Sequence, residues 1–367
     1  MIDKILIKNL PVNTEFISNP RTNNIVLGID KRLKIFKIKS KLTPNKIQAR
    51  FSWLKENEPE KHYQDIIKIF KKIIKNNTKI IGLTYRDEKF ISLLKKKSNL
   101  KMNYLDRRFY KIQDYKIGLS RIQDKISKKE YLVKAFKGNE KKIILMNHSL
   151  HHFINLKKFL LNLHQFINKE DIIYIEVPDC EKYFKGFDYT HIFEEHNNYF
   201  TKDSLENVLK SNSFKVLKFY RYKNKYEDSL NFWIKKDYKK VKSQISFTKE
   251  IRYIQNFKKS KKKIQDFFKK NNSKKIGILG AGHHTVSFIN IFELQRFNFT
   301  IYDDNKFKKD KYLPGTKFLI KKTSNMSPLD LLLIGVSPDK EENIMKKIQY
   351  KNFKMKSINP LSKYYFL

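Results

Sequence analysis

Two histidine-containing segments hold the residues of this chain that are best suited to chemistry. One is His148-Ser149-Leu150-His151-His152, directly after an apolar run that predicts a strand, and the other is Glu194-Glu195-His196, after the next such run. Because the carboxyl ends of parallel strands meet at one edge of a sheet, both segments should converge there. A histidine flanked by carboxylates gains basicity and a fixed tautomer, as a general base needs. We predict His196 as the catalytic base, with Glu195 and His152 beside it.

Both segments also have plainer interpretations. The histidines between 148 and 152 could cap the helix expected near Asn155, and the loop around His196 could be solvated and unspecific. Three histidines in five residues could bind a metal, but no cysteine or spaced carboxylate completes the set of ligands. The sequence therefore predicts no metal.

A candidate cofactor site lies between Thr78 and Asp106, where strand, helix and strand follow one another as at the start of a nucleotide-binding α/β unit. Gly82 begins the first strand-to-helix turn, which runs to Asp87 and would let the backbone approach a ligand. Asp106 ends the second strand, where a carboxylate can accept hydrogen bonds from ribose hydroxyls. With one glycine the turn could equally be an ordinary βα turn, and Asp106 a helix cap. We predict Gly82, Asp87 and Asp106 as the cofactor-binding residues.

A second glycine-containing turn, Gly280-Ala281-Gly282-His283-His284-Thr285, resembles a dinucleotide fingerprint with Thr285 at the third glycine. Asp303, about twenty residues later at a strand end, would be the ribose acid. One interpretation is NAD binding. The other is a Rossmann-like domain that only shapes a substrate pocket.

The apolar patterns predict an α/β protein with two Rossmann-like three-layer domains. Short alternating runs make residues 1–50 a small strand-rich lead-in. Continuous apolar runs, typical of buried parallel strands, place the first domain at 51–245 and the second at 246–367. A lysine-rich amphipathic helix from 247 to 270 separates the two sheets.

The composition restricts partners and compartment. Lysine and arginine number 79 against 37 acidic residues, a formal net charge of +42, but the lysines are spread along the chain and no nucleic-acid-binding motif accompanies them. We therefore expect no specific nucleic acid partner, although anionic substrates will be attracted. The single cysteine, Cys180, suits a reducing cytoplasm, and no apolar stretch of about 18 residues predicts membrane insertion.

Taken together, these strings resemble the SAM-dependent sugar C-methyltransferases, which act on the keto form of nucleotide-linked deoxysugars. The family's Asp-x-Asn-x-x-Lys-x-Gly-x-x-x-Pro-Gly-Thr stretch is similar to 303–316, with Asp310 at the glycine position. Its Tyr-His-Glu-His string followed by Tyr-Phe is similar to 193–200, and its Asn-Asn-x-Leu-x-His string to 147–152. The resemblance extends from about residue 58 to 359.

This resemblance implies a methyltransferase domain followed by a C-terminal Rossmann-like domain, with S-adenosyl-L-methionine (SAM) as cofactor. It implies that His196 removes the proton next to the sugar ketone, that Glu195 positions the base or the substrate, and that His152 contacts the sugar. The resulting enolate would attack the methyl group of SAM, whose ribose would lie on Asp106 and whose methionine end near Gly82. A nucleotide-sugar substrate and a monomer or homodimer are expected.

Three features depart from the family pattern. The zinc-binding cysteines that usually open the family are missing, and Phe193 replaces a tyrosine whose hydroxyl could stabilise an enolate oxygen. The acidic, glycine-rich SAM turn is replaced by residues 80–87, which include Arg86. Two other functions therefore stay open: a non-catalytic sugar-binding relative that has lost SAM, and an NAD-dependent nucleotide-sugar enzyme.

Overall fold

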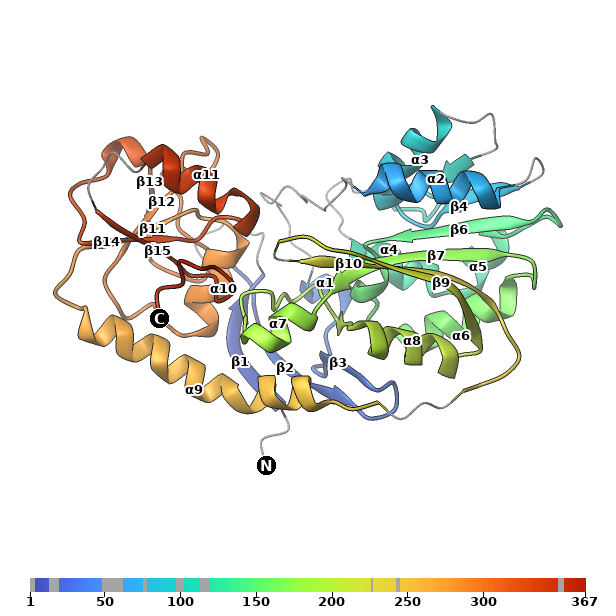
Figure 1. Cartoon of the computed structure of the whole chain (residues 1–367), viewed down its shortest axis with the longest axis horizontal. Coiled ribbons are helices and arrows are strands. Elements are labelled where there is room, and N and C mark those ends of the chain that lie inside the picture. Colours follow the sequence, from blue (N-terminus) through green and yellow to red (C-terminus); the bar gives the residue numbers. More distant parts are fainter. Residues whose placement is uncertain are drawn as a thin grey trace.

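The structure, a computed structural model, describes residues 4–12, 20–47, 62–74, 78–96, 102–112, 119–225, 227–241, 245–348 and 353–367. Figure 1 shows two α/β units, with the N-terminal strands and the long helix α9 (Thr248–Lys270) running beneath and between them. Among the described residues, no helix combines the length and the apolar character needed to cross a lipid bilayer.

The first unit is built on a six-stranded sheet in the order β5-β4-β6-β7-β10-β9. The four strands β5 (Met102–Tyr104), β4 (Lys79–Gly82), β6 (Lys142–Asn147) and β7 (Ile172–Asp179) are parallel. β10 (Asp228–Lys236) runs antiparallel to β7 and to β9 (Phe214–Tyr222). β6 and β7 are buried along their whole length, as their continuous apolar sequences predict.

Helices cover both faces of this sheet because alternate strand residues point to opposite sides. α2 (Tyr63–Ile73) and α3 (Glu88–Lys95) pack on one face, where Phe70 and Phe90 contact Tyr174. The other face contacts α4 (Leu119–Ile126), α5 (Lys129–Ala135), α6 (Leu156–Phe166) and α8 (Lys202–Ser211). This arrangement confirms the predicted three-layer α/β unit.

The second unit is a five-stranded parallel sheet, in the order β13-β12-β11-β14-β15. Its strands are β13 (Ile320–Lys321), β12 (Thr300–Tyr302), β11 (Ile276–Leu279), β14 (Leu331–Ile334) and β15 (Lys354–Ser357). α10 (His283–Ile291) follows β11 directly, and α11 (Pro338–Ile348) follows β14. The predicted second Rossmann-like domain is thereby confirmed.

The N-terminal strands do not form the separate lead-in that the sequence predicts but pack against both α/β units. β1 (Lys4–Pro11), β2 (Thr22–Asp30) and β3 (Ile35–Ile38) form an antiparallel sheet that takes β8 (Asn198–Tyr199) as its fourth strand; the short helix α1 (Pro44–Ile47) follows. One hydrophobic core joins this sheet to α7 (Glu181–Gly186), to α9 and to the second unit. The lead-in therefore connects the two α/β units.

One buried carboxylate, that of Asp87, organises the turn after β4. It accepts hydrogen bonds from the backbone N–H of Thr84 and from the backbone and side-chain amides of Asn147, each at 2.9 Å. A Cβ added at Gly82 would lie 2.4 Å from the Cβ of Asp87, so only glycine fits there. The carboxylate thus ties the turn to the end of β6.

Replacing Phe36 by alanine should destabilise the core shared by the N-terminal strands and α9. The Phe36 ring is buried and makes edge-on contacts with Phe184, Tyr199 and Tyr253. Loss of a buried phenylalanine costs about 3–5 kcal/mol. Urea unfolding should report this loss, whereas the exposed Phe307→Ala should change the free energy of unfolding by less than about 0.5 kcal/mol. Equal effects of the two substitutions would contradict the packing.

Asp87 should make stability depend on pH. Burial raises the pKa of Asp87 from an ordinary 3.8 to about 7, although the hydrogen bonds from Asn147 and Thr84 oppose the rise. Between these values the folded chain keeps a proton that the unfolded chain has released, so the free energy of unfolding falls as pH rises. Wild type should therefore lose stability relative to Asp87→Asn between about pH 4 and pH 7.

Urea unfolding of both proteins at several pH values measures this difference, with exposed Asp124→Asn as the matched control. The prediction is wrong if the difference in free energy of unfolding between wild type and Asp87→Asn stays constant as pH rises, or shifts in favour of wild type. Either result would mean that the amide donors keep the carboxylate ionised.

Candidate functional site

Histidine rings from two distant segments meet at the carboxyl edge of the first sheet. His151 and His152 lie on the 3-10 turn Leu150–His152 after β6, and His196 lies on the loop before β8. The His196 ring centroid is 4.5 Å from that of His151 and 4.8 Å from that of His152. The structure thus brings His152 and His196 together, as their positions after consecutive strands predict.

Two asparagines hold these segments against each other. The Asn197 amide donates to the carbonyl of His152 at 2.9 Å, and the Asn198 amide donates to the carbonyls of Phe153 at 2.7 Å and His151 at 3.3 Å. Both asparagines are buried, so without these hydrogen bonds their amide groups would have no water to bond to. The backbone next to His196 is therefore fixed to the turn that carries the other two rings.

The buried imidazoles are neutral near neutral pH. Burial lowers the pKa of His151 and of His152 well below the ordinary value, and the neighbouring imidazoles and Arg86 lower both further. A neutral imidazole has a lone pair that can take a proton or a metal ion. His196 is partly exposed and is the member of the cluster that a substrate can reach.

The second unit forms a wall of this site. The Phe193 ring stacks on His283 of α10 with the centroids 3.4 Å apart, and its centroid lies 4.4 Å from that of His196. The Nε2 atom of His283 is 3.1 Å from the carbonyl oxygen of Thr190. The segment that holds His196 is thus supported by both α/β units.

An acid and a histidine to which the sequence analysis assigned no role lie at the same boundary. Asp188 is fully buried and accepts hydrogen bonds from the N–H (2.9 Å) and hydroxyl (2.7 Å) of Thr190. Its other oxygen lies 3.4 Å from Nε2 of His191. Burial raises the pKa of Asp188 and lowers that of His191 to about 3. Their i,i+3 spacing before Glu194 was the signal that could have pointed to this pair.

His148, by contrast, turns toward a carboxylate inside the sheet. Its φ is +43°, uncommon for a residue with a side chain, and Nε2 lies 3.2 Å from Glu176 of β7. Glu176 also contacts Nε2 of His62 at 2.5 Å and accepts a hydrogen bond from Ser229 at 2.6 Å. Burial alone would raise the pKa of Glu176, but His148 and His62 outweigh it and hold that pKa well below its ordinary value.

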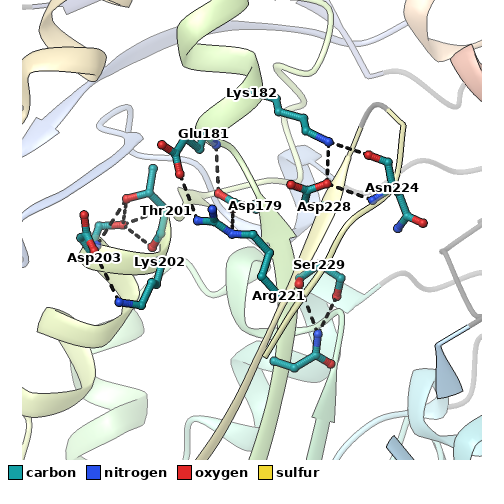
Figure 2. Close-up of polar contacts among 12 residues, drawn as sticks. Asp179, Glu181, Lys182, Thr201, Lys202, Asp203, Arg221, Asn224, Asp228 and Ser229 are labelled. Atoms are coloured by element: carbon teal, nitrogen blue, oxygen red, sulfur yellow. Dashed lines mark hydrogen bonds and ion pairs between the residues drawn. The ribbon is translucent and has the colours of Figure 1, made fainter. Parts of the chain in front are cut away.

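The far end of the same sheet edge is closed by internal ion pairs (Figure 2). Arg221 bridges Asp179 and Glu181, each at 3.0 Å, and Lys182 pairs with Asp228 at 2.5 Å. The charges at this end of the edge therefore have partners within the protein.

The three residues predicted to bind SAM differ in how accessible they are to a ligand. Asp106, at the tip beyond β5, accepts hydrogen bonds from Arg108 at 2.8 Å and from the N–H of Phe109 at 3.0 Å, and its side chain is 32% exposed. That carboxylate can still receive ribose hydroxyls. Asp87 is fully buried and already bonded to Thr84 and Asn147, and Gly82 packs against it. Of the predicted cofactor residues, Asp106 thus has a partly exposed carboxylate, whereas Asp87 is buried and its oxygens are already hydrogen-bonded.

The glycine turn of the second unit is satisfied from within. The Asp303 carboxylate accepts a hydrogen bond from the N–H of Ala281 at 2.9 Å and pairs with Nζ of Lys308 at 3.0 Å. The same ammonium donates to the carbonyl of Ala281 at 3.1 Å. Asp303 thus serves the turn itself, an arrangement that favours a domain shaping a pocket over NAD binding.

Comparison with known proteins identifies a domain. The family model described as "Methyltransferase domain" matches residues 50–218. A search of curated proteins found no match to this chain. The domain match confirms the predicted enzyme class, a methyltransferase that uses SAM.

Several solved methyltransferase structures are similar to part of the chain. A Burkholderia thailandensis 1,6-didemethyltoxoflavin-N1-methyltransferase with bound S-adenosylhomocysteine is 12% identical (TM-score 0.33), and the match covers 48% of this chain and 79% of that one. A Clostridium acetobutylicum SAM-dependent methyltransferase is 11% identical (TM-score 0.29), covering 49% and 93%. The methyltransferase domain of bacterial CtHen1-C is 15% identical (TM-score 0.33), covering 48% and 98%. These TM-scores lie below 0.5, so no conclusion about the substrate follows from them.

Proposed function

We propose that this chain methylates the carbon next to a ketone in a nucleotide-linked sugar, with His196 as the general base. The observation that carries the proposal is the meeting of His151, His152 and His196 at the open end of the sheet of a methyltransferase domain. Removal of a proton next to a carbonyl needs a neutral base that faces the substrate. His196 is the partly exposed ring of the cluster, and therefore the one that a substrate could reach.

The neighbours of His196 have distinct roles in this proposal. His152, whose ring centroid lies 4.8 Å from that of His196, would contact the sugar from the buried side of the cluster. Glu195 orients the base or the substrate, and Asn197 fixes the loop through its bond to the His152 carbonyl. Phe193, stacked between His196 and His283, offers an apolar surface where the related family has a phenol.

SAM, when bound, supplies an electrophilic methyl group. Asp106 would accept hydrogen bonds from its ribose hydroxyls, since this carboxylate ends β5 and is partly exposed. Arg86, on the turn after β4, has the charge to bind the carboxylate of the methionine end. Asp87 acts as a positioning residue, because its bonds to Thr84 and Asn147 set the path of the turn that carries Arg86.

The proposed substrate is an anionic nucleotide-sugar, which a chain with a formal net charge of +42 would attract. The second unit would shape the sugar pocket through α10, because His283 of this helix stacks on Phe193. The single, buried Cys180 is compatible with a reducing cytoplasm, and we propose a monomer or homodimer.

Substituting Arg86 by glutamine should remove selectivity for the carboxylate of SAM. Calorimetric titration should show that wild type prefers SAM to decarboxylated SAM by about 10-fold or more, as a charge-assisted hydrogen bond would give. Arg86→Gln should bind the two equally, and the distant, exposed Arg296→Gln should behave as wild type. An Arg86→Gln protein that keeps the preference would refute the assignment. If wild type binds neither ligand, the chain is better described as a sugar-binding relative without catalysis.

Substituting His196 by glutamine should slow proton abstraction. With a nucleoside-diphosphate keto-deoxysugar in deuterium oxide and no SAM, wild type should exchange the hydrogen next to the ketone, as followed by NMR. The variant should be slower by about 100-fold or more, the usual contribution of a general base. His164→Gln, which alters a histidine bonded to the Asp237 carbonyl instead, is the control and should retain the rate. Undiminished exchange in His196→Gln would assign the base elsewhere.

A further inference from the structure

We propose that His151, His152 and His196 bind a divalent transition-metal ion of the zinc class, with a fourth position open to water or another small ligand. One ring nitrogen of each residue lies within 4.8 Å of those of the other two. Zinc binds imidazole nitrogens at about 2.0–2.1 Å in tetrahedral geometry, which places the ligand nitrogens roughly 3.3 Å apart. Side-chain rotations that close the present separations by up to about 1.5 Å would therefore complete a three-histidine site.

The ring geometry favours convergence on one point. The rings of His151 and His152 are inclined by 44°, and the His196 ring is nearly perpendicular to both, at 88° and 85°. None of the three pairs is stacked face to face, which would turn the nitrogens away from a common centre. Three imidazoles with an open fourth position are a common ligand set for zinc.

The buried nitrogens otherwise lack good partners. Nδ1 of His151 and both ring nitrogens of His152 are buried, and within the described parts of the chain they have no well-shaped hydrogen bond, although the His152 ring also interacts with the backbone of Glu195. A buried polar atom without a partner costs about 1–3 kcal/mol, so such atoms call for an explanation. A metal ion would satisfy the lone pairs, and the pKa values of both histidines, lowered mainly by burial, keep them in the neutral form that binds metals.

The surroundings hold the ligands in place. Asn197 and Asn198 tie the carbonyls of His152 and His151 to the segment that carries His196, so the distance between the two segments is set before any ion arrives. Pre-positioned ligands lose little conformational freedom on binding. The charge of Arg86 near both histidines works in the opposite direction and limits the affinity.

A bound ion would occupy the lone pair that the proposed proton transfer requires from His196. Metal binding and the base role therefore exclude each other in one molecule. The metal site itself does not rest on the proposed function, because it follows from the three side chains alone.

The test is titration of the metal-free full chain with Co²⁺ and with Zn²⁺, without SAM or sugar. Wild type should bind one Co²⁺ with visible absorption bands, and Zn²⁺ should displace it. His151→Gln and His196→Gln should each weaken binding by at least about 100-fold, more than loss of an outer-shell contact would. His164→Gln, outside the cluster, should bind as wild type does.

Thermal melting shows whether each variant is folded, and Zn²⁺ should raise the melting temperature of wild type but not of the two cluster variants. Absence of a stoichiometric cobalt spectrum in wild type, or undiminished binding by folded His196→Gln, would overturn the metal site. Because no cofactor or sugar is present, either outcome leaves the methyltransferase proposal to its own tests.

Discussion

The site depends on the hydrogen bonds that Asn197 and Asn198 donate to the backbone carbonyls of the turn after β6. These two residues follow His196, and Asn198 also belongs to β8, which pairs with β3. One short segment is therefore bonded to the first sheet and to the N-terminal strands, while Phe193 packs on α10 of the second unit. Rings that are distant in sequence stay together because their backbones are fixed from several sides at once.

Buried carboxylates fix the remaining parts of the sheet edge. A carboxylate removed from water is costly unless donors or cations surround it. Asp87 is surrounded by amides from the turn after β4 and from the end of β6. Glu176 lies against the rings of His62 and His148, and so ties α2 to the sheet. These buried groups therefore hold the segments that surround them in a defined arrangement.

Much of the fold was predictable because the spacing of apolar residues shows which faces of a strand or helix are buried. The continuous apolar runs of β6 and β7 indicate strands covered on both faces, and the stripe from Tyr63 to Ile73 indicates a helix with one buried side. β8 has two residues, too few for any pattern, so its pairing with β3 was not predictable. The N-terminal strands join the second unit through long-range packing of apolar side chains in one core, which the pattern of a single segment does not reveal.

The site was predictable only to the level of which segments meet. His152 and His196 were expected at one edge because both follow parallel strands, but the left-handed backbone that turns His148 toward Glu176 leaves no trace in composition. Asp87 was predicted to bind the cofactor because nothing in the sequence shows that Thr84 and Asn147 donate hydrogen bonds to its carboxylate. The metal-binding possibility was set aside for want of another ligand, and the structure supplies His196 from a segment about 45 residues away.

A crystal structure of the chain with S-adenosylhomocysteine tests the central claim most directly. The account predicts the ribose hydroxyls within hydrogen-bonding distance of the Asp106 carboxylate, the amino-acid carboxylate facing Arg86, and the sulfur atom directed toward the space beside His196. Density for the ligand at the Gly280–Gly282 turn, or a well-ordered edge at β4 and β5 that remains empty at saturating ligand, would contradict it.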